Sequence, residues 1–156
     1  MRHRRKRVAS RFAVPALAAI AVALLVLPST GAGRGERRLR ATLSGAAVVP
    51  PPGDPDARGT ARIALRGTKV CWRLVVSGIQ RPHAAHIHFA PRGREGPAVV
   101  PLFLTPRSLA RPKRGCVTAR RVEVRDIARR PRRYYVNVHN DEYPNGAVRG
   151  QLSRIR

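Results

Sequence analysis

The sequence predicts an all-β protein, built as an antiparallel sandwich with one short helix. Two observations lead to this prediction. After residue 38, most of the chain consists of short segments in which apolar and polar residues alternate, as in strands with one buried face. Clusters of glycine, proline and asparagine separate these segments at short intervals, as turns between antiparallel strands require. We find no internal repeat that would indicate a solenoid.

Each predicted strand is short and carries its apolar residues on one face. The first is typical, because Leu39, Ala41 and Leu43 alternate with Arg40 and Thr42. Strands are expected at residues 39–43, 59–66, 69–77, 84–90, 98–104, around 116–117, 133–139 and 146–152.

Turn signals and one helix separate these strands. Residues 50–56 are too rich in proline to join a sheet, and Gly67-Thr68 fits a two-residue hairpin turn. Residues 120–130 are predicted as the helix, which Pro131 ends because proline cannot continue it. Residues 140–145 form the turn of the last hairpin.

The first 32 residues predict a secretory signal peptide. Residues 1–11 contain six lysine or arginine residues and no acid, and an apolar run at 13–27 leads into small residues. That run is short for a membrane span, which needs about 20 residues. An uncleaved membrane anchor is the alternative. We expect a secreted or extracytoplasmic protein, with a linker at 33–38 and one domain at 39–156.

The chain is strongly basic, with 32 lysine and arginine residues against 8 acids and a net charge of +24. This charge favours an anionic cell-wall polymer or membrane surface as partner, with an extracellular protein as the alternative. Nucleic acid is disfavoured because aromatic residues make up only 4% of the chain, too few for a base-stacking platform.

Cys71 and Cys116 are the two cysteines of the chain. In an oxidising compartment they are expected to form one disulfide, which would contribute about 4 kcal/mol through loop closure. Two unpaired thiols are the alternative. Because Cys71 shares a strand face with Arg73, the bond is expected on the outer surface or at a sheet edge.

Four of the five histidines lie in or beside two predicted strands. His86 and His88 share one face of their strand, opposite Ile87, and Asn137 and His139 share one face of another. If the two strands are neighbours, three imidazoles meet at one point. Such a cluster is either a copper or zinc site or a polar patch on the sandwich.

Other polar residues near these strands are candidates for supporting roles. Asn137 or a backbone carbonyl is expected to bind the second ring nitrogen of a metal-bound histidine. Arg149 either pairs with Asp141 or Glu142 across the last hairpin, or faces a ligand near His139. We find no carboxylate pair, nucleophile elbow or phosphate-binding glycine loop, so no catalytic residue is predicted.

Several motifs together resemble the CHRD domain, a family named for chordin and common in secreted bacterial proteins. They are V-C-W-R-L-V-V-S-G-I, A-A-H-I-H-F-A-P-R-G-R-E-G-P, G-C-V and Y-Y-V-N-V-H-N-D-E-Y-P-N-G-A-V-R-G-Q-L. The resemblance covers residues 39–152. It implies an extracytoplasmic binding or structural module without an established activity.

The H-x-x-H-x-H motif and the later V-H also make the chain similar to secreted copper/zinc superoxide dismutases. This similarity implies a Greek-key sandwich, superoxide-dismutase-like or immunoglobulin-like. It also implies His86, His88 and His139 as copper ligands, His83 as a non-ligand histidine and Arg149 as a charge-guiding arginine. No histidine lies between His88 and His139, so the metal-bridging ligand of those enzymes is missing. We therefore expect a binding or structural module, with copper or zinc binding and possible weak redox activity as one alternative and cationic surface adhesion as the other.

Overall fold

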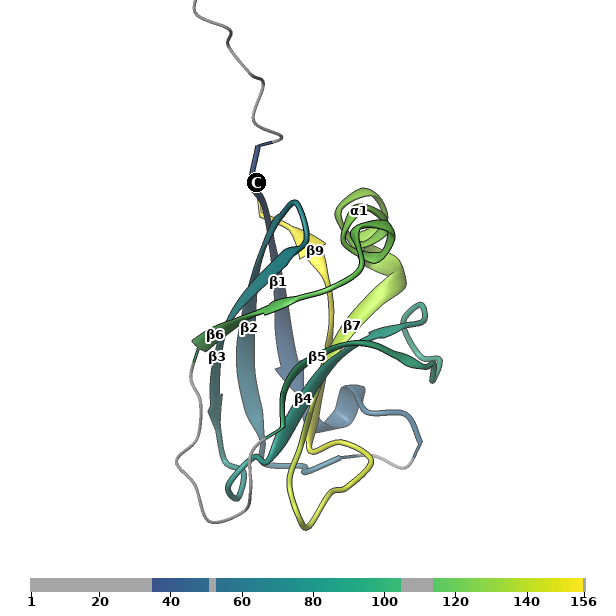
Figure 1. The fold of residues 1–156 in the computed structure, drawn as a ribbon. Coiled ribbons are helices and arrows are strands. Elements are labelled where there is room, and N and C mark those ends of the chain that lie inside the picture. The colour runs from purple at the N-terminus through teal and green to yellow at the C-terminus, as the bar shows by residue number, and fades with distance from the viewer. Residues whose placement is uncertain (1–34, 51–52, 105–113, 156) are drawn as a thin grey trace, which may run out of the picture. The chain divides into compact units, whose positions relative to one another are not determined.

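The computed structural model describes residues 35–50, 53–104 and 114–155 (Figure 1). The chain divides into two units, Met1–Gly31 and Ala32–Arg156, and every described residue lies in the second unit. The predicted signal peptide and the first part of the linker fall outside the described residues. Within the described ranges, no helix is both long enough and apolar enough to cross a membrane.

The described residues form one antiparallel sheet in which β5, β4, β7, β8, β1, β2, β3 and β6 lie side by side in that order (Figure 1). A ninth strand, β9, pairs with β1. The bounds are β1 Arg37–Ser44, β2 Arg58–Arg66, β3 Lys69–Ser77, β4 Ala84–Phe89, β5 Ala98–Leu104, β6 Arg114–Thr118, β7 Tyr134–His139, β8 Val148–Gln151 and β9 Ser153–Arg154. The pairs β3–β6 and β4–β7 join strands that are not consecutive, as Greek-key connections do.

The sheet is curved, so that the half made by β1, β2 and β3 faces the half made by β4, β5 and β7 (Figure 1). The rings of Trp72 on β3 and Phe103 on β5 lie 5.3 Å apart across this interior. The predicted all-β antiparallel fold with one short helix is confirmed. The two layers of the predicted sandwich are opposite parts of one continuous sheet.

The interior is filled by the apolar residues that alternate along each strand. Burying each such side chain contributes about 1.5–3 kcal/mol. Fully buried members from both halves are Leu39, Leu43, Ile63, Val70, Ile87, Val100, Val136, Val138, Val148 and Leu152.

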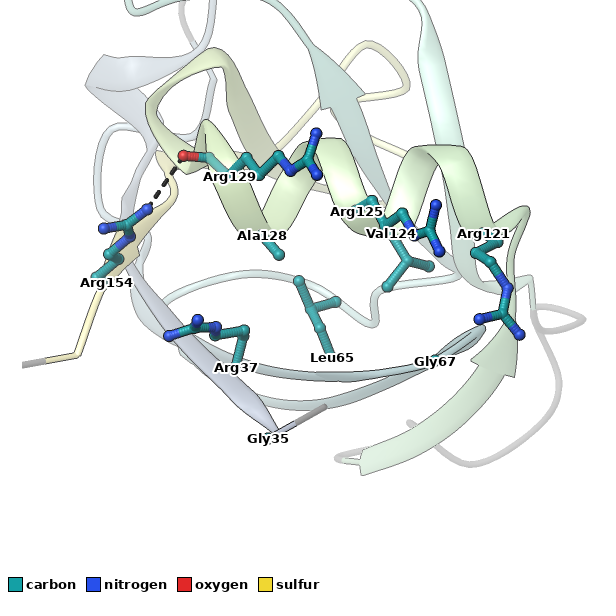
Figure 2. A pocket seen from close by; sticks show the side chains of 10 residues that line it. All are labelled: Gly35, Arg37, Leu65, Gly67, Arg121, Val124, Arg125, Ala128, Arg129 and Arg154. Atoms are coloured by element: carbon teal, nitrogen blue, oxygen red, sulfur yellow. Dashed lines mark hydrogen bonds between the residues drawn. The ribbon is translucent and has the colours of Figure 1, made fainter. Parts of the chain in front are cut away.

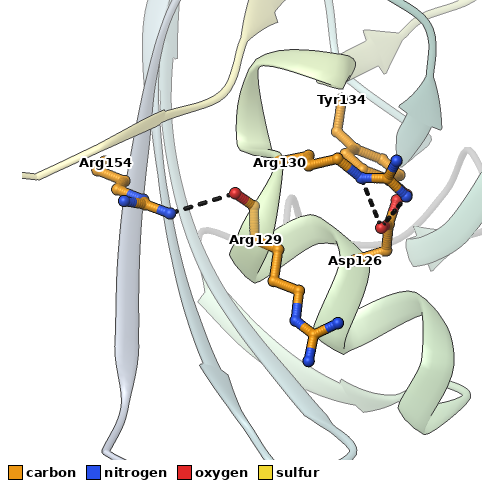
Figure 3. Close-up of polar contacts among 5 residues, drawn as sticks. All are labelled: Asp126, Arg129, Arg130, Tyr134 and Arg154. Atoms are coloured by element: carbon orange, nitrogen blue, oxygen red, sulfur yellow. Dashed lines mark hydrogen bonds and ion pairs between the residues drawn. The ribbon is translucent and has the colours of Figure 1, made fainter.

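One α-helix, α1 (Arg121–Arg129), packs on the sheet through Val124 and Ile127, which are buried. Figure 2 shows Val124 pointing from the helix toward the sheet. Its C-terminal end is held by polar contacts (Figure 3). The Asp126 carboxylate accepts hydrogen bonds from Arg130 and from the Tyr134 hydroxyl. The helix lies within the range predicted for it and ends before the short 3-10 turn Pro131–Arg133. A second 3-10 turn, Gly45–Ala47, follows β1.

The predicted disulfide is present between Cys71 on β3 and Cys116 on β6. The two cysteines are direct partners in the β3–β6 register. As expected from the face that Cys71 shares with Arg73, the bond lies on the outer side of the sheet, beside the terminal strand β6.

Candidate metal centre

The histidine cluster depends on β4 and β7 being neighbours, and the structure places them side by side. Their antiparallel register pairs His86 with Asn137 and Ala84 with His139. His139 is therefore diagonal to His86 on the same face, within reach of an imidazole side chain. Ile87 between the two β4 histidines points into the core and is fully buried.

The pairing of β4 with β5 on its other side is irregular. The register shifts between Ala85 and His86 and again between Ile87 and His88. Such bulges often re-aim a side chain next to a functional site. Each β4 histidine follows one of these shifts.

The imidazoles of His86, His88 and His139 form one cluster on the outer face of the sheet. One ring nitrogen from each lies within 4.8 Å of the other two. A zinc ion bound at about 2.0–2.1 Å by tetrahedral imidazoles separates their nitrogens by about 3.4 Å, so a modest closing of the cluster would form a site.

Two backbone carbonyls fix the orientation of two of these rings. His88 Nδ1 lies 2.9 Å from the carbonyl oxygen of Gly96, and His139 Nδ1 lies 2.9 Å from that of Pro144. A carbonyl oxygen only accepts, so in the neutral rings both Nδ1 atoms carry the proton and both Nε2 atoms present a lone pair. Histidines that bind metals are commonly held in this way.

The Nε2 lone pairs of His88 and His139 have different surroundings. His139 Nε2 lies 3.2 Å from His86 Nδ1, which donates to it. His88 Nε2 is buried and has no hydrogen-bond partner among the described residues. An unpartnered buried polar atom costs about 1–3 kcal/mol. A cation bound at the cluster would give this nitrogen its partner.

Burial keeps the three rings neutral, the form in which imidazole binds metals. It lowers the pKa of His139 to about 4, against a smaller opposing effect of the Pro144 carbonyl. Burial also lowers the pKa of His86, with further contributions from His88 and His83. Burial lowers the pKa of His88 as well, although the Gly96 carbonyl opposes it.

Asn137 holds the loop between β7 and β8, whereas backbone carbonyls orient the histidines. Its Nδ2 donates to the carbonyl of Asn145 at 2.9 Å. Gly146 lies directly against this side chain, with φ of 136°, and a Cβ there would fall 2.4 Å from Asn137 Oδ1. The loop so held carries the Pro144 carbonyl that orients His139.

Arg149 is buried, with 2% of its surface exposed, and supports the other side of the cluster. Its Nη2 donates to the carbonyls of Pro91 and Arg94 at 3.2 and 2.7 Å. Its guanidinium carbon lies 3.5 Å from the centre of the Tyr135 ring, and that ring stacks on His88 at 4.8 Å.

Arg149 therefore does not form the predicted pair with Asp141 or Glu142, because its guanidinium contacts two backbone carbonyls and the Tyr135 ring. The acids of the hairpin have other neighbours. Glu142 accepts a hydrogen bond from Gln80, and Asp141 Oδ1 lies 3.6 Å from His83 Nε2.

His83 lies outside the cluster of three rings. Its backbone N–H donates to the His139 carbonyl at 3.0 Å, and its ring faces Asp141. A backbone carbonyl was among the expected partners of the histidines, but the sequence does not point to those of Gly96 and Pro144, because a backbone oxygen has no residue type to recognise. The one hint in the sequence was the glycine at position 96. Only glycine fits there, since a Cβ would lie 2.0 Å from the Phe89 carbonyl oxygen.

Comparison with known proteins adds one finding. A family model described as CHRD domain matches residues 39–152, which include β2 to β8 and all but the first two residues of β1. No curated protein and no solved structure matches the chain. Because the model covers well over half of the sequence and the whole histidine cluster, this chain belongs to the CHRD domain family.

Proposed function

We propose that this CHRD domain is an extracytoplasmic module that binds one copper or zinc ion through His86, His88 and His139. The observation that carries the proposal is the buried Nε2 of His88, which has no partner and lies in a cluster with two further imidazole nitrogens. A purely structural cluster of hydrogen-bonded histidines leaves this nitrogen unsatisfied.

The donor set selects the kind of metal. All three donors are imidazole nitrogens, and the cluster contains no carboxylate or thiol. Imidazole suits copper and zinc, whereas calcium and magnesium require oxygen ligands. Three histidines with a fourth position left to water match an open zinc site or a copper(II) site with mixed nitrogen and oxygen ligands.

The two sides of the cluster differ in their access to solvent. His139 is 8% exposed, whereas His86 and His88 are half-buried. A metal bound here would have its free coordination position toward solvent on the side of the β4 histidines. That arrangement favours binding and release of an ion, or coordination of an external ligand, as the function of the module.

The test is a metal titration of the purified protein after chelator treatment. We expect one tightly bound copper or zinc ion per chain by competition with a chromogenic chelator, and loss of that ion in His86→Ala. The matched control is His83→Ala, which removes a nearby histidine outside the cluster and should retain the ion. Far-ultraviolet circular dichroism verifies that both variants fold.

A variant at His88, whose Nε2 is buried and unpartnered, makes the test more specific. His88→Gln retains a polar side chain but removes the imidazole, and should abolish stoichiometric binding. Equal metal content in the wild type, His86→Ala and His88→Gln would contradict the proposal and leave the cluster a structural polar patch.

A further inference from the structure

Four arginines form a row across the outer face of the other half of the sheet. The strand registers pair Arg40 with Arg62, Arg62 with Arg73, and Arg73 with Arg114. All four side chains are exposed, while the strand neighbours of Arg40, Arg62 and Arg73 are buried in the core. With strands about 4.8 Å apart, this arginine ladder extends about 14 Å across β1, β2, β3 and β6.

The ladder has an energetic cost that the fold does not require. Like charges directly opposite on neighbouring strands destabilise a sheet. Within the described residues, none of the four side chains forms an ion pair or hydrogen bond. The carboxylate of Glu36, which lines the same surface, is paired with Arg38 at 2.6 Å.

Protection of a sheet edge does not explain the ladder. Charged residues on terminal strands prevent pairing with another chain, and Arg114 on β6 fits that role. Arg62 and Arg73 lie on β2 and β3, which are paired on both sides. A charge repeated on interior strands against its own repulsion indicates a binding role.

The surface around the ladder has the shape and chemistry of an anion-binding groove. Arg62, Arg73 and Arg114 line a groove of about 750 Å³ that the Cys71–Cys116 pair also lines. Guanidinium groups bind phosphate oxygens in pairs of hydrogen bonds. The aromatic residue along the groove, Trp72, is 5% exposed and offers no ring on which a base could stack.

We propose that the arginine ladder binds a linear polyanion with phosphate in each repeat, laid across the strands of β1, β2, β3 and β6. A row of fixed charges matches a chain of regularly spaced anions. A membrane surface fits less well, because Ile155 is the one large exposed apolar side chain that the described part of the groove offers for insertion. This site lies on different strands from the histidines, so the proposal is independent of metal binding.

A second group of arginines provides a matched control. Arg121 and Arg125 on α1 lie beside Arg37, Arg129 and Arg154 around a groove of about 410 Å³ (Figure 2). Arg154 Nη2 donates a hydrogen bond to the Arg129 carbonyl at 3.2 Å (Figure 3). Arg121 and Arg125 are exposed helix residues without cross-strand partners. Replacing them removes the same charge as replacing two ladder arginines.

The experiment measures binding of long-chain inorganic polyphosphate to the purified protein by fluorescence anisotropy over a range of salt concentrations. We compare the wild type, Arg62→Gln/Arg73→Gln and Arg121→Gln/Arg125→Gln. The ladder variant should bind about tenfold more weakly at low salt. The slope of log K against log salt should also fall by about 1.4, because each phosphate contact on a single strand contributes about 0.7. The helix variant should stay within about twofold of the wild type.

Each other outcome would overturn the proposal. An equal loss in both variants means diffuse attraction by net charge, without a site. Unchanged affinity in the ladder variant places the site elsewhere. Binding to vesicles of phosphatidylglycerol without binding to polyphosphate assigns the face to membranes, and preference for single-stranded DNA over polyphosphate assigns it to nucleic acid. His86→Ala should bind polyphosphate as the wild type does. The polyphosphate result can therefore be interpreted even if the metal site proves wrong.

Discussion

Arg149 brings a positive charge into a buried position where backbone carbonyls and an aromatic ring receive it. Burial lowers the pKa of its guanidinium, which nonetheless stays protonated at neutral pH. Its contacts join the loop at Pro91 and Arg94 to Tyr135, and through Tyr135 to His88. A flat guanidinium can satisfy these contacts together, whereas a lysine ammonium cannot.

Arg149→Lys is therefore expected to lower the free energy of unfolding by about 1–3 kcal/mol. Metal affinity should fall about tenfold or more, because the support for His88 is lost. Urea unfolding and chelator competition measure the two effects. Arg94→Lys is the control, since its carbonyl remains and its exposed side chain changes little. Equal effects of the two substitutions would contradict the role assigned to Arg149.

The lowered pKa of His139 predicts how the stability of the metal-free protein depends on pH. Its pKa is about 6.5 in the unfolded chain and about 4 in the fold, chiefly because burial opposes the charge. The unfolded chain therefore binds more protons between these values, and stability rises with pH across that window. The contribution is complete above pH 6.5 and is lost as pH falls toward 4.

We expect the urea midpoint of the metal-free protein to fall steadily from pH 6.5 to pH 4. His139→Gln removes this titration, so its midpoint should vary less across the same window. Carboxylates titrate in both proteins, and the difference between the two curves isolates the histidine. Parallel curves would show that His139 titrates normally in the fold.

At the scale of elements, the loop between β7 and β8 makes the second half of the histidine site. Gly146 permits this loop to lie on Asn137, and Asn140 Oδ1 accepts from the Tyr143 N–H at 2.7 Å. These contacts fix the Pro144 carbonyl, which in turn fixes the ring of His139. The position of the His139 ring thus depends on Gly146, a glycine in the loop between β7 and β8.

Gly146→Ala is expected to destabilise the protein by about 1–3 kcal/mol, because it combines positive φ with a Cβ in contact with Asn137. It should also weaken metal binding. Gly67→Ala is the matched control, since Gly67 also has positive φ, of 62°, but open space around its Cβ. It should lose about 1 kcal/mol and bind metal normally. Thermal unfolding and the chelator assay report both properties.

The strands were predictable because their signals are local. Alternation of apolar and polar residues over a short segment, as at Lys69–Ser77, predicts both that a strand forms and which face is buried. The last predicted strand, residues 146–152, is longer than the observed β8, since Gly146 and Ala147 remain in the loop and Leu152 lies between β8 and β9. That β4 and β7 are neighbours was not predictable from the residues, because 44 residues lie between them in the sequence and pairing over such a separation depends on the whole fold.

At the scale of the whole molecule, the disulfide closes a loop that contains β4 and β5. Cys71 and Cys116 are 45 residues apart, and the loop between them carries His86 and His88. Constraining such a loop in the unfolded chain contributes about 4 kcal/mol in the chain-entropy model. The sequence indicated this bond through the number of cysteines and the predicted compartment, and the register of β3 with β6 supplies the reason for it.

Cys71→Ser/Cys116→Ser is expected to lower the free energy of unfolding by about 2–5 kcal/mol. Chemical denaturation of the wild type, the wild type with reductant and the double variant measures the effect. The reduced wild type and the variant should agree. A variant as stable as the oxidised protein would show that strand pairing alone holds β6 in place.

The order of the strands leaves β5 and β6 at the two ends of the sheet, and each pairs with only one strand among the described residues. Both ends carry features that discourage recruitment of a second chain. β5 contains Pro101, which lacks an N–H, and its pairing with β4 is broken by two register shifts. β6 has five residues, begins with Arg114 and is tied to β3 by the disulfide. These features are expected to oppose aggregation of the domain through edge-to-edge strand pairing.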